Sequence, residues 1–339
     1  MRGTRKGESG IALLVVLLSI TLLTIVVIEF TDFAQVETHL ALSARNALQA
    51  TYLARSGVNV AEALVSIDGK LSPGSDGGPE DFWARPYPPL PIGDGTAVFR
   101  ARDEARFLNL NDMMLSGAFN NEHYQVFVRL FKILGVDRAV LSAILDWIDA
   151  DGAPRTDPPG AEQPFYLGLR PPTFVRNGPL LTLRELLLVR GVTPTVLSRL
   201  EGFVTVLPPG ELRVNVNTAP AEVIMALSEG TLADPGVVER LIATRATATF
   251  GDKTELKSVT GLWEALGASG QAIVDTKSTY FRLEGVGEIG DVRRGVIEVV
   301  KREGTRLTRM SWTPSNANLA LTSLPPSDFL ATLPVFGDR

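Results

Sequence analysis

An almost unbroken run of apolar residues extends from Ile11 to Ile28, directly after a short polar leader that contains Arg2, Arg5 and Lys6. In a helix, about 18 residues rise roughly 27 Å, close to the thickness of the hydrocarbon core of a bilayer. The pattern predicts a transmembrane helix over residues 11–30. Because basic residues favour the cytoplasmic side, we expect a single pass through the cell inner membrane, with the bulk of the chain in the periplasm.

The position of the small residue before this run indicates how the leader is processed. A secretory signal peptide has its cleavage site after the apolar core, but here Glu29 and Asp32 follow the core, and the break lies before it, between Gly10 and Ile11. This layout is typical of a prepilin-like signal, in which residues 1–10 are removed and the apolar segment stays as an anchor. An uncleaved anchor is the alternative.

Val15 is the fifth residue after the predicted cleavage site. Most pilin-type proteins have glutamate there, and its carboxylate neutralises the amino terminus of a neighbouring subunit in the apolar core of the filament, where an unpaired charge is costly. A subunit with valine cannot make this pair. It is tolerated best where no subunit lies above it, at the tip of a filament.

The periodicity of the remaining chain predicts an α+β fold. Helical spacing continues over residues 31–66, so that one spine helix extends from the membrane. Residues 67–104 read as a Gly/Pro-rich linker without regular structure over 68–95, followed by a first strand, Thr96–Arg102. Residues 276–312 contain three further segments of alternating apolar and polar residues: Thr279–Gly287, Asp291–Lys301 and Arg306–Trp312. Together with the first strand, they are expected to form an antiparallel sheet that packs on the helix. Residues 313–339 are predicted to be a flexible tail.

Residues 105–275 are predicted to be an inserted, all-α domain. Its expected helices are Asp112–Phe119, Tyr124–Gly135, Arg138–Asp149, Leu181–Val189, Pro194–Phe203, Pro220–Leu227 and Val237–Ala246. Two internal echoes are typical of SAM-like and helix-hairpin-helix modules. One is an Asn-x-Asn element before an expected helix N-cap, Asp112 or Thr218; the other is a helix followed by a glycine turn, at Gly191 and at Gly261.

Composition excludes several functions. The chain has no cysteine and only two histidines, His39 and His123, which argues against thiolate metal sites and against an enzyme that depends on cysteine or histidine. Without the leader, the net charge falls from −5 to about −7, which argues against nucleic acid as a partner. One alternative remains: the segment Val214–Leu227 resembles helix-hairpin-helix DNA-uptake receptors, although Glu229 and Asp234 would repel phosphate.

The candidate chemistry is an acidic loop, with carboxylates at Asp146, Asp149, Asp151, Asp157 and Glu162. Oxygen ligands without cysteine favour calcium over zinc. The spacing does not match an EF-hand, and carboxylates that cap turns are the alternative interpretation.

The ordered set of these motifs resembles the minor pseudopilin GspK family of the type II secretion system. It comprises GIALLVVLL at Gly10–Leu18, ARSGVNVAEALV at Ala54–Val65, RFLNLNDM at Arg106–Met113, LDWIDADG at Leu145–Gly152, GAEQPFY at Gly160–Tyr166, NGPLLTLRELLLVRGVT at Asn177–Thr193 and VNVNTAP at Val214–Pro220.

The resemblance implies a pilin-like α/β domain with a large helical insertion and no catalysis. It implies a subunit that caps the pseudopilus, starts its assembly and limits its length. The expected partners are the minor pseudopilins GspI, GspJ and GspH, the major pseudopilin GspG, the prepilin peptidase and the inner membrane. It also implies calcium at Asp149, Asp151, Asp157 and Glu162, with Asp146 less directly matched. An accessory minor pilin of a type IV pilus or DNA-uptake system is the alternative.

Overall fold

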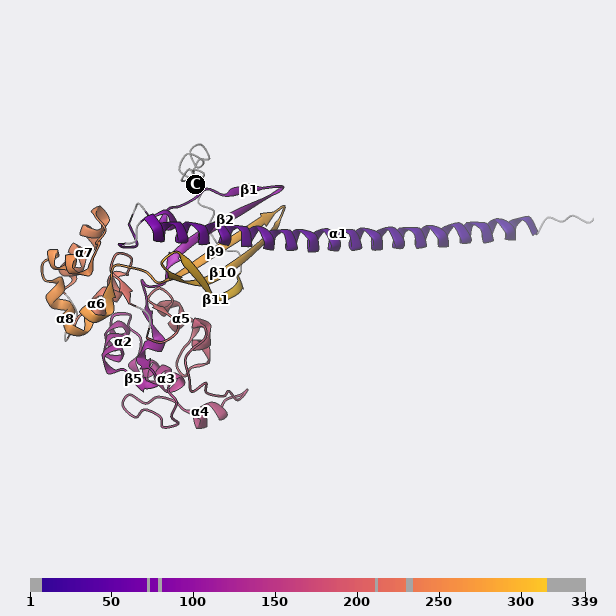
Figure 1. Cartoon of the computed structure of the whole chain (residues 1–339). Helices are drawn as coiled ribbons and strands as arrows, with labels where there is room; N and C mark the ends of the chain where they lie inside the picture. Colours follow the sequence, from indigo (N-terminus) through magenta and orange to yellow (C-terminus); the bar gives the residue numbers. More distant parts are fainter. Residues whose placement is uncertain (1–7, 72–73, 79–80, 211–212, 230–233, 316–339) are drawn as a thin grey trace, which may run out of the picture.

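A computed structural model of the chain describes residues 8–71, 74–78, 81–210, 213–229 and 234–315. Its dominant feature is α1 (Glu8–Leu71), a helix that projects from the rest of the molecule as a rod (Figure 1). The helix is longer than predicted and begins inside the expected leader, of which residues 1–7 lie outside the described part. The predicted tail also lies outside it from residue 316 onward, and residues 313–315 belong to a strand.

From Gly10 onward, the first half of α1 is exposed along its length and contains a stretch long and apolar enough to cross a membrane. Four hydroxyl groups in this stretch are satisfied within the helix: Ser19, Thr21, Thr24 and Thr31 each donate to the carbonyl oxygen four residues earlier, at 2.8 Å. Internal pairing of polar groups is what an apolar solvent requires of a helix. This half of α1 is therefore compatible with a single-pass anchor.

The second half of α1 packs on a five-stranded antiparallel sheet, whose order is β1-β2-β9-β10-β11. The strands are β1 (Leu90–Ile92), β2 (Gly95–Asp103), β9 (Tyr280–Ile289), β10 (Val292–Glu303) and β11 (Arg306–Ser315). The four predicted strands are thus confirmed. Gly290 and Gly304 adopt φ of 54° and 63° in the two hairpins that join the last three strands, a conformation that glycine tolerates without strain.

Two glycines allow α1 to approach the sheet closely. A Cβ atom at Gly285 would collide with the carbonyl oxygen of Ala54, and one at Gly287 with that of Ala50. Because α1 has alanines here and β9 has glycines, the two backbones lie so close that neither glycine can be replaced by a larger residue without a shift. A core of buried residues fills the remainder of this interface: Val58, Ala61, Leu64, Val65, Phe99, Phe281, Leu283, Val296 and Val300.

The expectation that residues 68–95 contain no regular element is wrong. The segment holds the end of α1, a 3-10 helix η1 (Phe82–Ala84) and the edge strand β1. Aromatic contacts fix it on the sheet: Trp83 meets Phe281 edge-on at 5.1 Å, and Tyr87 stacks on Phe99 at 5.2 Å. These contacts between segments distant in sequence order a stretch whose local composition disfavours helix and strand.

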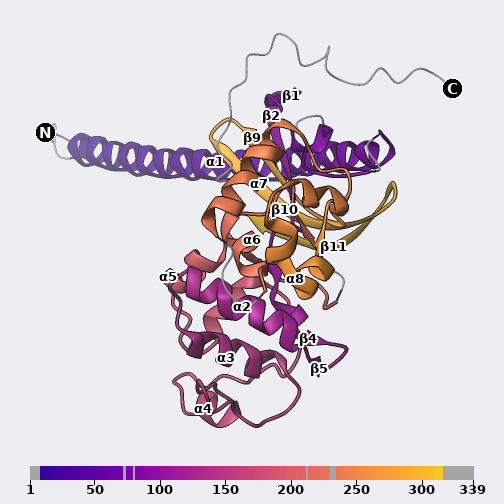
Figure 2. The ribbon, with the colours of Figure 1, turned by 90° about the vertical axis from the view of Figure 1, so that its left-hand side faces the viewer.

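A large insert lies between β2 and β9 and to one side of α1 (Figures 1 and 2). It contains α2 (Asn121–Ile133), α3 (Arg138–Ile148), α4 (Gln163–Leu167), α5 (Pro194–Leu200), α6 (Ala221–Leu227), α7 (Pro235–Thr247) and α8 (Leu262–Ile273), and the 3-10 helices η2 (Leu110–Met113), η3 (Leu183–Leu188) and η4 (Lys253–Ser258). One continuous apolar core runs through it, with Trp147, Phe127 and Phe131 among the largest buried side chains.

The insert is not all-α, contrary to prediction. The described residues of the insert include three short strand pairs: β3 (Leu108–Asn109) with β6 (Val204–Thr205), β4 (Met114–Leu115) with β5 (Ala118–Phe119), and β7 (Val214–Asn215) with β8 (Val274–Asp275). The helix expected over Asp112–Phe119 is also wrong. Ser116 and Gly117 adopt φ of 51° and 79°, which ends any helix and turns the chain into the β4–β5 hairpin.

The Asn-x-Asn elements do not provide the predicted N-caps at Asp112 and Thr218; Asn109 precedes η2 and Pro220 precedes α6. The asparagines instead hold distant backbone. The Asn111 amide exchanges two hydrogen bonds with Leu180, its Oδ1 accepting at 2.8 Å and its Nδ2 donating at 3.0 Å. Asn217 does the same with Phe250, both at 3.0 Å. Each buried amide therefore mimics one rung of a β-ladder.

The second echo is confirmed in its arrangement. Gly191 follows η3 and Gly261 follows η4, with φ of 82° and 83°, and each leads into the next helix, α5 or α8. The segments before both glycines are 3-10 rather than α-helical.

Candidate functional site

Three carboxylates of the acidic loop converge at one end of α3. Asp149 is the C-cap of α3, Asp151 follows in the loop, and Glu162 is the residue before α4. One oxygen of each lies within 4.8 Å of the others. Glu162 is only 2% exposed and Asp149 only 9%. Both Glu162 oxygens and Asp149 Oδ1 are buried without a hydrogen-bond partner among the described residues, although orphaned buried acceptors are rare in folded proteins.

The electrostatics of this triad favour either protons or a cation. Burial raises the pKa of Asp149 to about 7, and the charges of Asp151, Asp146 and Glu162 add to the rise. Burial also raises the pKa of Glu162 to about 7, with the charge of Asp146 next. Carboxylates that repel one another in a desolvated site are stabilised in the ionised form by a bound cation.

Asp146 and Asp157, which were predicted as further ligands, lie differently. Asp146 is fully buried, and its carboxylate accepts the backbone N–H of Arg155 at 3.1 Å. It therefore holds the backbone of the acidic loop in place. A Cβ atom at Gly160 would collide with this carboxylate, which explains the glycine. Asp157 is exposed and does not belong to the converging group. The structure therefore brings together Asp149, Asp151 and Glu162.

The donor set fits calcium. Calcium takes six to eight oxygens from mono- or bidentate carboxylates, carbonyls and water, and tolerates irregular geometry. Three carboxylates provide three to six oxygens, leaving room for water. The Arg155 guanidinium lies over the rings of Phe119 and Tyr124, at 4.5 and 5.2 Å, and its charge opposes the rise in the pKa of Asp149. Asp149, Asp151 and Glu162 are thus the residues that would hold the ion.

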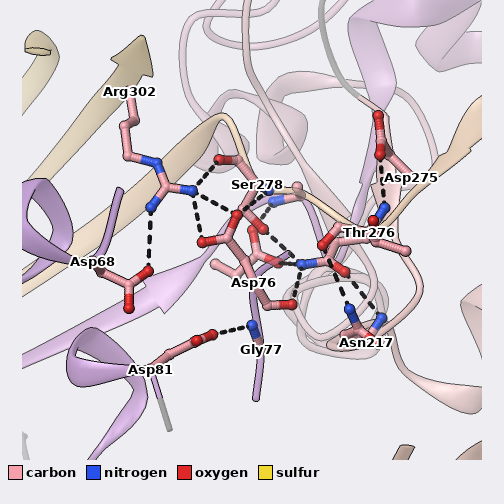
Figure 3. Close-up of polar contacts among 12 residues, drawn as sticks. Asp68, Asp76, Gly77, Asp81, Asn217, Asp275, Thr276, Ser278 and Arg302 are labelled. Atoms are coloured by element: carbon pink, nitrogen blue, oxygen red, sulfur yellow. Dashed lines mark hydrogen bonds and ion pairs between the residues drawn. The ribbon is translucent and has the colours of Figure 1, made fainter. Parts of the chain in front are cut away.

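A second buried cluster, not anticipated from the sequence, joins α1 to the linker, β10 and the insert (Figure 3). We call Asp68, Asp76, Asp81 and Arg302 the Arg302 joint. The Arg302 Nη2 atom contacts Asp76 Oδ1 and Oδ2 at 2.6 and 2.5 Å, and Nη1 lies 3.5 Å from Asp68 Oδ2. Asp81 Oδ2 accepts the N–H groups of Gly77 and, at 2.9 Å, Gly78.

One guanidinium faces three carboxylates in this joint, and the pKa values reflect the imbalance. Burial raises the pKa of Asp68 to about 7, reinforced by the charges of Asp81 and Asp76 and opposed by Arg302. Burial also raises the pKa of Asp81, against the two backbone hydrogen bonds that it accepts. Each carboxylate has donors, so the joint is a structural ion-pair network rather than an empty cation site.

Asn215 connects the joint to the insert. Its Nδ2 group donates to the Asp76 carbonyl oxygen at 3.1 Å, to Ser278 Oγ at 2.8 Å and to Asp103 Oδ2 at 3.1 Å. Ser278 N in turn donates to Asp76 Oδ2 at 2.8 Å. The only sequence signal was the Asn-x-Asn echo, because Asp76 and Asp81 lie in a Gly/Pro-rich stretch that is typical of solvated turns.

The leader positions lie in the exposed part of α1. Gly10, Ile11 and Val15 are all exposed there, with open space around Gly10. Cleavage between Gly10 and Ile11 stays a prediction.

Comparison with known proteins identifies relatives across most of the chain. Models of the family "Type II secretion system (T2SS), protein K" match residues 105–209 and 214–283. Type II secretion system protein K of Aeromonas hydrophila is 30% identical over 320 residues, covering 88% of this chain and 94% of that protein. The Pseudomonas aeruginosa protein of the same name is 28% identical over 308 residues, covering 88% of this chain and 90% of the relative.

A solved structure has the same fold. A chain of the crystal structure of the GspK-GspI-GspJ complex from the enterotoxigenic Escherichia coli type 2 secretion system superposes with a TM-score of 0.71 at 18% identity. The match covers 81% of this chain and 99% of that chain. Together with the long apolar helix and the sheet, it confirms the predicted mixed class of helix and sheet and is consistent with a pilin-like fold. The matches favour the secretion family over the DNA-uptake alternative.

Proposed function

Because the chain belongs to the type II secretion system protein K family, it is a minor pseudopilin, and we propose that it caps the tip of the pseudopilus. In this position it helps to start assembly and limits the length of the filament. The single observation that carries the proposal is Val15, an apolar, exposed residue of α1 where a pilin-type subunit would carry glutamate. A chain without that carboxylate cannot neutralise the amino terminus of a subunit stacked above it.

Several expectations complete this proposal. The prepilin peptidase cuts between Gly10 and Ile11, α1 anchors the mature chain in the inner membrane, and the sheet and insert lie in the periplasm. The role is structural rather than catalytic. GspI and GspJ are partners, as they are in the complex named for the similar structure; GspH and the major pseudopilin GspG are further partners.

The calcium proposal rests on the triad Asp149, Asp151 and Glu162, with a structural role for the ion. Its support is the set of unpartnered, buried oxygens on Glu162 and Asp149. A bound ion would tie the end of α3 to the start of α4 and hold the loop between them. The finer classification of the insert as SAM-like or helix-hairpin-helix-like is supported by the repeated 3-10 helix, glycine and helix at Gly191 and Gly261.

A reconstitution assay tests tip capping. Full-length subunits are combined in liposomes with either the wild-type chain or Val15→Glu, and the filaments that form are counted and inspected for the position of the chain. We expect Val15→Glu to insert normally but to appear within filaments as well as at the tip. Val16→Glu is the matched control, since it adds the same charge one residue away, outside the pairing position. Unchanged tip placement of Val15→Glu would contradict the proposal.

Partner choice is tested separately. The chain from Phe33 onward is mixed with the periplasmic parts of GspI, GspJ and GspH, and the complex is weighed by size-exclusion chromatography with multi-angle light scattering. We expect a discrete heteromer with one copy of each bound subunit. A free monomer, both with calcium and with chelator, would refute the assembly role.

A further inference from the structure

A cluster of exposed apolar side chains lies around α4, next to the acidic loop. It comprises Phe165, Leu167, Leu169, Phe174, Leu181, Leu187 and Leu188, which we call the distal patch. Phe174 is 75% exposed and Leu181 is 70% exposed. Single exposed apolar residues are ordinary, whereas a concentration of seven in one stretch is typical of an interaction surface.

Hydrogen bonds hold the first parts of this stretch side by side. The Thr173 N–H donates to the Tyr166 carbonyl oxygen at 3.1 Å. The Gln163 amide bonds the backbone in both directions, donating to Thr173 O at 3.2 Å and accepting from Val175 N at 3.1 Å. The segment that carries Phe174 therefore lies against α4, which carries Phe165 and Leu167.

The third part of the stretch is held to the same place. The N–H of Arg190 donates to the Tyr166 hydroxyl at 3.1 Å, and its guanidinium lies over the Phe165 ring at 4.9 Å. Leu187 and Leu188 are the last two residues of η3, and only Val189 separates them from this arginine. Glu185 links Leu181 to the segment that carries Phe174, because it accepts the N–H of Leu181 at 3.0 Å and pairs with Arg176 at 2.6 Å. The exposed apolar side chains thus share one region of the surface rather than being scattered.

The charge of this region is opposite to that of the whole chain. Residues 163–190 contain four arginines, at 170, 176, 184 and 190, against one acidic residue, Glu185, a formal charge of +3, while the chain as a whole carries −5. Glu185 is itself paired with Arg176 at 2.6 Å. The surplus guanidinium groups would complement carboxylates on a partner.

The position of the patch decides which kind of partner can reach it. In both views α4 lies at the end of the insert that is most remote from α1 (Figures 1 and 2). The apolar half of α1 projects in another direction, so the bilayer that it enters does not meet α4. A lipid surface is thereby disfavoured, and a protein is favoured.

We infer that the distal patch is a docking surface for a partner protein that presents apolar side chains surrounded by carboxylates. The inference goes beyond the proposed function, which rests tip capping on Val15 of α1 and does not involve the distal patch. Its energetic centre is the pair Phe174 and Leu181, because the most exposed large apolar groups lose the most water-accessible surface on binding. The surrounding arginines confer specificity and a dependence on salt.

The test uses the full chain in phosphatidylcholine nanodiscs with 1 mM calcium. A phage library that displays random 12-residue peptides is panned on the wild type and, for counter-selection, on the double variant Phe174→Ser/Leu181→Ser. We expect the enriched peptides to combine Asp or Glu with Leu, Ile or Phe. Equal recovery on both proteins, or enrichment of Lys and Arg, would overturn the inference.

The most enriched peptide is then synthesised and titrated. Binding should weaken at least tenfold in Phe174→Ser/Leu181→Ser and in Arg170→Glu/Arg184→Glu, and should weaken for the wild type as salt is raised. Ile242→Ser is the matched control on α7, an apolar residue that is also exposed (36%) and lies outside the patch; it should bind as the wild type does. Loss of binding in the control, or binding displaced by phosphatidylglycerol liposomes, would contradict a protein-docking patch.

The variants are also tested for heteromer formation with the other minor pseudopilins. If the distal patch selects acidic, apolar peptides but the chain forms no heteromer, only the assembly role is refuted. A normal heteromer whose distal patch selects no acidic, apolar peptide would refute the docking surface alone.

Discussion

Replacing Asp68 by asparagine isolates the charge imbalance of the Arg302 joint. Asp68 is fully buried beside Asp76 and Asp81, and its pKa is raised from 3.8 to about 7 by burial and by these two charges. A raised pKa means that the folded chain favours the protonated carboxyl. The contribution of Asp68 to stability is therefore fully present below pH 3.8 and is lost as the pH rises to about 7.

The magnitude follows from the two pKa values. At about 1.4 kcal/mol per pH unit, the whole loss amounts to about 4 kcal/mol, of which roughly 2–3 kcal/mol falls between pH 5 and pH 8. Asparagine cannot ionise, but it keeps an oxygen that can accept the N–H of Phe82, as Asp68 Oδ1 does at 3.3 Å. The free energy of unfolding of Asp68→Asn, relative to that of the wild type, should therefore rise by roughly 2–3 kcal/mol from pH 5 to pH 8.

Urea unfolding in detergent micelles, followed by circular dichroism at several pH values between 5 and 8, measures this difference. Because other buried carboxylates also titrate, only the difference between the two proteins is diagnostic. Asp157→Asn makes the same chemical change on an exposed side chain and is the matched control. If the wild type and Asp68→Asn lose stability in parallel across this range, the argument that Asp68 is held protonated by its surroundings is wrong.

Three further replacements test other features. Glu162→Gln should abolish the rise in melting temperature that calcium gives the wild type, whereas Asp157→Asn should keep it. Because the pKa of Glu162 is raised to about 7, the calcium affinity of the wild type should fall as the pH drops below 7. A calcium affinity that does not depend on pH would contradict the assignment of the triad as the binding site. Gly287→Ala places a methyl group against the Ala50 carbonyl oxygen and should lower the free energy of unfolding by about 1–3 kcal/mol in urea titrations; an unchanged midpoint would show that α1 can move away from the sheet. Gly10→Ala should slow conversion to the mature mass by the prepilin peptidase, and full-rate conversion would remove the prepilin interpretation of the leader.

Local pattern was sufficient for the spine and the sheet. The apolar run after Gly10 and the alternating segments around Phe99, Phe281 and Val296 have one dominant period each, so their structure depends little on the rest of the chain. The edge strand β1 was missed because Pro91 lies within it, and proline is tolerated only where no ladder hydrogen bond is needed, as at a sheet edge.

The polar sites were predictable only in part. The three carboxylates of the triad lie within fourteen positions of one another in the sequence: Asp149, Asp151 and Glu162. This proximity was enough to predict that they form one site, but it did not exclude Asp157 from that site. The Arg302 joint could not be predicted in this way. Its arginine is separated from Asp68 and Asp76 by 234 and 226 positions, so that nothing in the local composition distinguishes these buried acids from ordinary turn residues.

The pairing of β2 with β9 has a consequence for the origin and the dissection of this chain. The last residue of β2, Asp103, lies opposite Phe281, which is the second residue of β9, so the whole insert leaves and re-enters the sheet at adjacent points of neighbouring antiparallel strands. Without residues 104–280, these two strands would need only a tight turn to form a hairpin. The insert can thus be viewed as a hairpin loop that has grown into a domain, and a chain in which a short turn replaces it should retain the helix-on-sheet subunit while losing the acidic triad and the distal patch together.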